Sequence, residues 1–143
     1  MSRDILIKHR YLKEVKRLKL FKEAKSFSDI ENEINKLGKY KGKAFEVFAE
    51  AYLTLGFNMP YEKVFPENKL TKKHFSRLRI THTTVNVKGI DGVLETSTKE
   101  LHTYQVKFRS TSESLSWNEL TGSVAASDRA DALLIFTNVK EIN

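Results

Sequence analysis

A strand-like stretch carries polar side chains at spacings that suit phosphate chemistry. Residues 103–109, TYQVKFR, alternate polar and apolar side chains. Because residues two apart in a strand face the same side, Gln105 and Lys107 are expected on one face and their apolar neighbours on the other. A short turn upstream, GIDGV at 89–93 offers Asp91. A converging acid, amide oxygen and lysine would suit Mg²⁺ and a phosphate ester.

The simpler interpretation of QVK alone is a half-exposed strand with its polar residues outward. The neighbouring Asp91 favours a chemical site instead. Zinc is not indicated, because none of the four histidines shows an HxH or HExxH spacing and the chain has no cysteine. Each histidine is expected to be a surface or strand residue. No GxxxxGK[ST] phosphate loop and no GxSxG elbow occurs.

A helix upstream of these strands can bring a carboxylate to them. Residues 41–57, KGKAFEVFAEAYLTLGF, place aromatic and aliphatic side chains in helical register, with Gly56 as the C-terminal signal of the helix. Glu46 lies at the margin of the apolar face, and Glu50 lies one turn further along. Either glutamate could reach across the edge of a sheet packed on this helix, and Glu46 is preferred only by its position in the motif described below.

The rest of the chain predicts an α/β sandwich around a mixed sheet. A short strand is expected in 61–68, followed by a loop or helical turn over 69–77 and β-forming residues from Arg79. A hairpin is expected over 93–106, with STKE as its turn. The next helix has a capping-box pattern, and the apolar run 130–138 predicts a strand buried on both faces. The cap of this helix is formed by Ser116 and Glu119. The residues expected on its buried side are Trp117, Leu120, Val124 and Ala125.

Composition and charge limit the classes of protein that fit. The chain has 143 residues, 40% of them apolar, which is the length of one ordinary domain. No apolar run is long enough for a membrane span or for a secretory signal, so no membrane partner and a cytoplasmic location are expected. The formal net charge is +7. This excess favours a polyanionic partner.

Much of the positive charge lies in an N-terminal segment. Residues 8–25 hold eight Lys or Arg against two Glu, and their periodicity predicts an amphipathic helix. This helix either contacts a phosphate backbone or is a solvated surface helix. A second helix is predicted from Ser28, which forms a capping-box pattern with Glu31. Residues 1–40 are therefore interpreted as a basic helical extension of a core that spans 41–143.

Taken together, these motifs resemble the PD-(D/E)XK nuclease superfamily, and especially its Mrr-like restriction branch. GKAFE precedes GIDGV, thirteen residues separate Asp91 from QVK, and ADALLIFTN follows. The Mrr-like branch often carries Gln in place of the second acid, as Gln105 would here. The resemblance covers roughly residues 41–138 and implies a restriction-endonuclease-like αβββαβ core with a central mixed sheet flanked by helices, here with extra N-terminal helices.

The resemblance also implies roles for individual residues in metal-dependent hydrolysis of phosphodiesters. Asp91 would be the principal Mg²⁺ ligand, with Gln105, the carbonyl of Val106 and Glu46 completing the set. Lys107 would orient or activate the attacking water and stabilise the transition state. Mn²⁺ is the expected substitute for Mg²⁺.

The same resemblance implies DNA as substrate, helicase or DNA-recognition domains linked in a longer protein, and an oligomeric state that stays open. A rim of basic side chains is expected to contact DNA phosphates. The residues expected in this rim are Arg109, Lys72, Lys73, Arg77 and Arg79. The alternative is a nucleic-acid-binding module with a nuclease-like fold and no catalysis.

Overall fold

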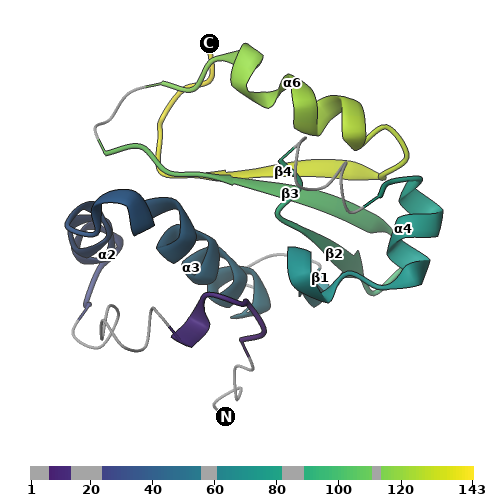
Figure 1. Ribbon diagram of the computed structural model, residues 1–143, viewed down its shortest axis with the longest axis horizontal. Helices are drawn as coiled ribbons and strands as arrows, with labels where there is room; N and C mark the ends of the chain where they lie inside the picture. The colour runs from purple at the N-terminus through teal and green to yellow at the C-terminus, as the bar shows by residue number, and fades with distance from the viewer. Residues whose placement is uncertain (1–6, 14–23, 56–60, 82–88, 111–113) are drawn as a thin grey trace.

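A twisted sheet separates two helical layers (Figure 1). Helices α2 (Phe27–Asn35) and α3 (Lys41–Leu55) lie against one face of the sheet, and α6 (Trp117–Ala126) lies over the other. The molecule therefore belongs to the α/β class, as the sequence predicted. The computed structural model describes residues 7–13, 24–55, 61–81, 89–110 and 114–143.

Within these ranges the strands follow one another across the sheet in chain order. They are β1 (Tyr61–Pro66), β2 (Gly92–Thr96), β3 (Leu101–Lys107) and β4 (Ala132–Thr137). The pairs β1/β2 and β2/β3 are antiparallel, whereas β3/β4 is parallel with α6 as the connection. The mixed sheet and the hairpin over 93–106 are confirmed. The predicted order of helix, strands, helix and strand is found with one addition, a short helix between β1 and β2.

The basic stretch after β1 is helical. A short 3₁₀ turn, η2 (Glu67–Lys69), leads to α4 (Lys72–Leu78). The stretch 69–77, for which a loop or a helical turn was expected, is therefore mostly helical. Thr71 and His74 cap its N-terminus reciprocally, and Arg79 ends it with a left-handed φ of 53°. The β-forming stretch expected from Arg79 falls largely in 82–88, outside the described residues.

The larger part of the core lies between α3 and the sheet. Phe45 packs against Phe108 and Phe136, with ring centroids 5.1 and 5.3 Å apart. Tyr104 and Val106 point from β3 into the same cluster. The alternate residues of β3 face the other layer, where Leu101 packs with Ile90 and Val93. The two clusters therefore confirm the predicted alternation of faces along β3.

The predicted buried face of α6 is wrong apart from Leu120. Trp117 and Val124 are 58% and 50% exposed, and Ala125 is exposed as well. The inward face consists of Leu120 and Ser123. The small serine lets the helix approach the backbone, and its hydroxyl donates a hydrogen bond to the Gly89 carbonyl at 2.9 Å. The capping box of Ser116 and Glu119 is confirmed.

The strand β4 is also less buried than its apolar sequence predicted. It pairs with β3 alone and lies at the edge of the described sheet. Residues 133–137 are half-buried and Ala132 is exposed, so burial on both faces was wrong. An edge position explains this, because one side of the strand has no neighbouring strand in this part of the chain to cover it.

The cap of α2 differs from the predicted one by two residues. Ser26 is the N-cap, and its hydroxyl accepts a hydrogen bond from the Asp29 N–H at 3.2 Å. Ser28 lies inside the helix, so its capping box with Glu31 is wrong. Ser26 and Asp29 have the same spacing as Ser28 and Glu31. The Asp29 carboxylate also accepts a hydrogen bond from the Lys25 N–H.

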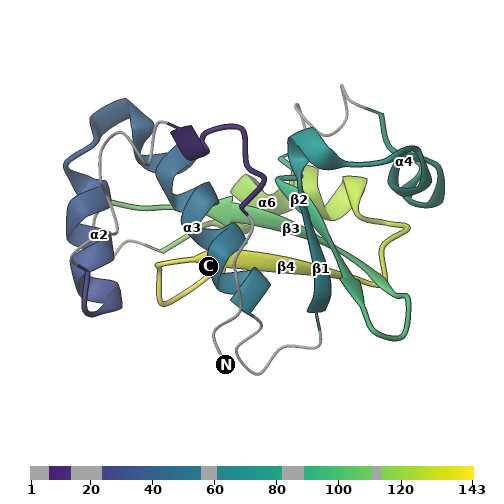
Figure 2. The ribbon, with the colours of Figure 1, turned by 90° about the horizontal axis from the view of Figure 1, so that it is seen from below.

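The N-terminal segment is packed onto the core. Residues 7–11 are not helical, so the predicted helix does not begin at Lys8, and residues 14–23 lie outside the described ranges. Figure 2 shows residues 7–13 lying between α3 and the edge formed by β1. Ile7, Tyr11 and Leu12 join the same hydrophobic cluster as α3. None of the described helices has the length and apolar character needed to cross a membrane.

Candidate active site

Asp91 is fixed where β2 begins to separate from its neighbours. Its N–H donates to the Tyr104 carbonyl and its carbonyl accepts from the Glu67 N–H, both at 2.9 Å. Its carboxylate accepts from the Val106 N–H at 2.7 Å. The side chain thus supplies to β3 an acceptor that a strand backbone would otherwise provide, and three backbone contacts set the position of this acid.

The two glycines around Asp91 make room for side chains of β3. Gly89 has a φ of 77°, and a Cβ there would lie 2.7 Å from the Gln105 amide nitrogen. A Cβ on Gly92 would lie 2.3 to 2.4 Å from the ring and hydroxyl of Tyr104. The motif GIDG therefore has a steric basis, because larger residues on either side would displace Gln105 or Tyr104.

Glu46 reaches Asp91 from the helical layer. The two carboxyl groups are in side-chain hydrogen-bond contact, although they come from α3 and from the start of β2. Burial, with the charge of Glu46 next in importance, raises the pKa of Asp91 to about 8. Burial likewise raises the pKa of Glu46. Two carboxyl groups this close cannot both ionise easily, so they share a proton unless a cation is present.

Glu50 has a different role from Glu46. It is buried, and its carboxylate accepts from the Lys8 N–H at 2.7 Å and from the His9 N–H at 2.9 Å. Both oxygens are therefore used to hold the N-terminal segment on α3. Of the two glutamates, it is Glu46 whose carboxyl group meets Asp91.

His9 belongs to this cluster and was missed in the sequence. It is 7% exposed, and its Nε2 lies 3.0 Å from Oε2 of Glu46. Burial lowers the pKa of the imidazole, although the charge of Glu50 acts in the opposite direction. The expectation of a surface or strand histidine is wrong here. No sequence pattern could have indicated it, because His9 and Glu46 are 37 positions apart.

Gln105 and Lys107 lie on the opposite face of β3 from Tyr104 and Val106. Gln105 is 3% exposed, and its Oε1 has no hydrogen-bond partner among the described residues. Lys107 is half-buried, and within the described ranges no ion pair or hydrogen bond engages its ammonium group. Nor does any such contact in those ranges join either residue to the Glu46–Asp91 pair. The structure thus brings together two of the predicted site residues through their side chains and Val106 through its N–H.

The side chains of this cluster provide part of the ligand set that Mg²⁺ requires. No group of three or more His, Asp and Glu side chains in the described part of the chain has the arrangement of a metal site. However, Mg²⁺ is commonly held by one or two carboxylates, with water and substrate phosphate as further ligands. The Glu46–Asp91 pair provides such carboxylates. Gln105, on the opposite face of β3 from Val106, has a buried oxygen without a partner among the described residues.

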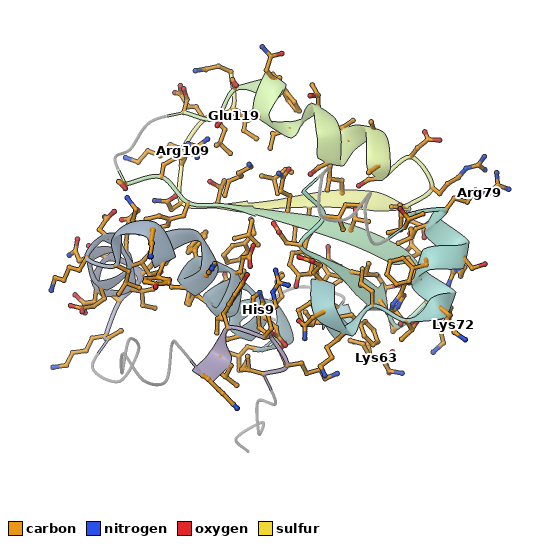
Figure 3. All side chains as sticks on the ribbon, in the orientation of Figure 1. His9, Lys63, Lys72, Arg79, Arg109 and Glu119 are labelled. Carbon is orange, nitrogen blue, oxygen red and sulfur yellow. The ribbon has the colours of Figure 1, made fainter. Side chains whose placement is uncertain are left out.

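The basic residues predicted for DNA contact fall into two places. Arg109 is near the end of β3 and forms an ion pair with Glu119 (Figure 3). The others are exposed on or just after α4, against the β2–β3 hairpin, where Lys73 binds Glu95 at 3.1 Å. In Figure 3, Lys72 and Arg79 lie at the opposite end of the molecule from Arg109. The rim is therefore not one continuous strip.

Comparisons of the chain with protein-family models, with curated proteins and with solved structures find no match in any of the three.

Proposed function

We propose that this chain is a Mg²⁺-dependent DNA endonuclease domain that hydrolyses phosphodiester bonds. The observation that carries the proposal is the contact between the Glu46 and Asp91 carboxyl groups, made beside the Val106 N–H at the start of β2. A pair of half-buried acids is costly for a stable fold unless a cation or a proton bridges them. The contact of these two acids at the start of β2 is consistent with a metal-binding role.

In this proposal, Glu46 and Asp91 hold the ion, and Mn²⁺ can replace Mg²⁺. When bound, the ion supplies Lewis-acid polarisation of a phosphate oxygen and activation of a water molecule. Asp91 contributes a carboxylate whose position is fixed by its bond to Val106. Gln105 contributes a neutral oxygen that lacks a partner in the described residues. The Val106 carbonyl remains the proposed additional ligand.

Lys107 stabilises the negative charge that develops on the phosphate during attack. Because no described carboxylate neutralises it, its full charge is available to the substrate. The exposed lysines and arginines of α4 provide further contacts with the DNA backbone. Arg109 is paired with Glu119 and contributes less. Linked helicase or DNA-recognition domains are the expected partners of such a domain.

One observation favours a second candidate, a nucleic-acid-binding module without catalysis. Gln105 is buried and, like Lys107, has no described contact with the Glu46–Asp91 pair. A chain that binds DNA only would keep the exposed basic residues of α4 and would not need the two acids. The two candidates therefore differ in what they expect of divalent ions.

A nicking assay on supercoiled plasmid tests the proposal. The parent chain is incubated with Mg²⁺, with Mn²⁺ or with EDTA, and Lys107→Met is the matched variant that keeps the length of the side chain. The proposal expects nicked or linear plasmid with either metal, none with EDTA, and loss of cleavage in the variant. DNA binding without cleavage in any metal would favour the binding module, and equal cleavage by Lys107→Met would remove Lys107 from the site.

A further inference from the structure

The backbone at His9 is anchored independently of its side chain. Glu50 binds the N–H groups of Lys8 and His9 at 2.7 and 2.9 Å. These bonds do not depend on what the side chain at position 9 is. The segment therefore stays on α3 when the imidazole is replaced, and the imidazole can be tested separately from the fold.

The hydrogen bonds of the imidazole define which nitrogen carries the proton. The Tyr11 N–H points at Nδ1 at 3.2 Å, so Nδ1 is the acceptor. Nε2 then carries the hydrogen and donates it to Oε2 of Glu46 at 3.0 Å. The ring also lies 5.1 Å from the ring of Tyr11, which limits its rotation. Together these contacts give His9 one orientation and one donor, and the donor is aimed at Glu46.

We propose that His9 is a positioning residue, which holds the Glu46 carboxylate in place for Asp91 and for the metal ion that the two acids bind. This inference rests on the proposed function. A glutamate side chain has several rotatable bonds, so a free Glu46 would lose conformational entropy each time it bound an ion. With Oε2 held by Nε2–H, that loss is already incurred in folding. Partners of this kind beside metal ligands typically change metal affinity 10- to 100-fold.

A purely structural role for His9 makes a different prediction. In that case the imidazole would only fill space beside Tyr11, and any smaller residue would lower the stability of the fold without a specific effect on metal binding. A glutamine at position 9 separates the two roles. Its side-chain amide can donate near the place of Nε2, although it lacks the aromatic ring.

The experiment measures Mn²⁺ binding by isothermal titration calorimetry to the parent chain, to His9→Ala and to His9→Gln. Urea unfolding of each protein monitors the fold. We expect His9→Ala to bind Mn²⁺ about tenfold more weakly and His9→Gln to recover most of that loss. Unchanged binding by His9→Ala would overturn the proposal. So would a loss in both variants that follows their stability and is not recovered by glutamine.

A second measurement separates this inference from the proposed function. The ¹⁵N spectrum of the His9 ring is recorded for the parent and for Glu46→Ala without metal. A protonated Nε2 whose signal shifts in Glu46→Ala supports the positioning contact, and an Nδ1-protonated ring overturns it. If the parent binds no Mn²⁺, the proposed function fails, and this spectrum still decides whether His9 holds Glu46.

Discussion

The carboxyl groups of Glu46 and Asp91 meet across the boundary between the helical layer and the sheet. The residues are 45 positions apart in the sequence, and each is held by a separate partner. Val106 N–H binds Asp91 at 2.7 Å, and His9 lies 3.0 Å from Glu46. The pair is therefore positioned by the fold before any ligand arrives, as an active site requires.

Substitution of Gly92 by alanine should lower stability through a clash with Tyr104. A Cβ at this position would lie 2.3 Å from the tyrosine ring, so the ring or the strand must move. We expect a loss of about 2 kcal/mol in the free energy of unfolding, measured by urea denaturation. The matched control is Gly42→Ala in α3, where a Cβ meets nothing within 4 Å. It should raise stability by up to about 1 kcal/mol. Equal effects of the two substitutions would contradict this account.

The sequence predicted the order and type of most elements because their periodicity is strong. The alternation in 103–107 and the apolar register of 41–55 are local signals, and both are found. The buried face of α6 was not predictable in the same way. Leu120 could share a buried face with Val124 or with Ser123. The face that is buried depends on how closely Ser123 approaches Gly89. That distance is a property of packing, which periodicity alone does not contain.

The site was predicted in part for the same reason. Asp91 lies in a motif whose glycines could be recognised, whereas the selection of Glu46 over Glu50 depends on which one the N-terminal segment uses. His9 carries no pattern that connects it to Glu46. Long-range contacts of this kind arise from the packing of the segment onto α3, and a local reading of residue types cannot predict them.

Removal of the Glu50 carboxylate should release the N-terminal segment. Glu50→Ala leaves the N–H groups of Lys8 and His9 without their buried acceptor. We expect a loss of about 3 kcal/mol in the free energy of unfolding and faster amide hydrogen exchange at both residues. Glu33→Ala is the control, because the Glu33 side chain is 46% exposed and pairs with Lys36 at the protein surface. Slow exchange at His9 in Glu50→Ala would show that the segment is held by other contacts.

The stability of the fold should decrease as the pH falls below the pKa of an ordinary histidine, and His74 should contribute to this decrease. Burial lowers the pKa of His74 from 6.5, although its partner Glu95 opposes this. The unfolded chain therefore binds more protons than the folded chain in this range. The contribution of His74 is fully present above pH 6.5 and is lost as the pH falls through the lowered pKa.

The melting temperature of the parent and of His74→Gln, followed from about pH 7.5 to about pH 5, checks this expectation. Glutamine keeps a donor for Glu95 but does not titrate. The variant should lose less stability on acidification than the parent does, and His9 is unchanged in both proteins. Parallel curves would exclude His74 as a source of the pH dependence.

DNA binding should depend on the exposed residues of α4 more than on Arg109. Arg109 is paired with Glu119, whereas Lys72 is exposed on the helix surface. Lys72→Ala should weaken DNA binding and reduce the slope of log affinity against log salt by about 1, as measured by fluorescence anisotropy. Lys36→Ala, at the exposed C-cap of α2, serves as the control and should leave the slope unchanged. A larger effect of Arg109→Ala would place the DNA at the other end of the sheet.

The most direct test of the Glu46–Asp91 pair as the active centre compares Asp91→Asn with Asp131→Asn in metal-dependent plasmid cleavage. Both aspartates accept a hydrogen bond from a backbone N–H of β3, Asp91 from Val106 at 2.7 Å and Asp131 from Leu101 at 2.8 Å. Only Asp91 meets Glu46. We expect Asp91→Asn to remain folded and to lose cleavage about 100-fold or more, whereas Asp131→Asn should cleave at close to the parent rate. Cleavage by Asp91→Asn at the parent rate would contradict the assignment of the Glu46–Asp91 pair as the active centre.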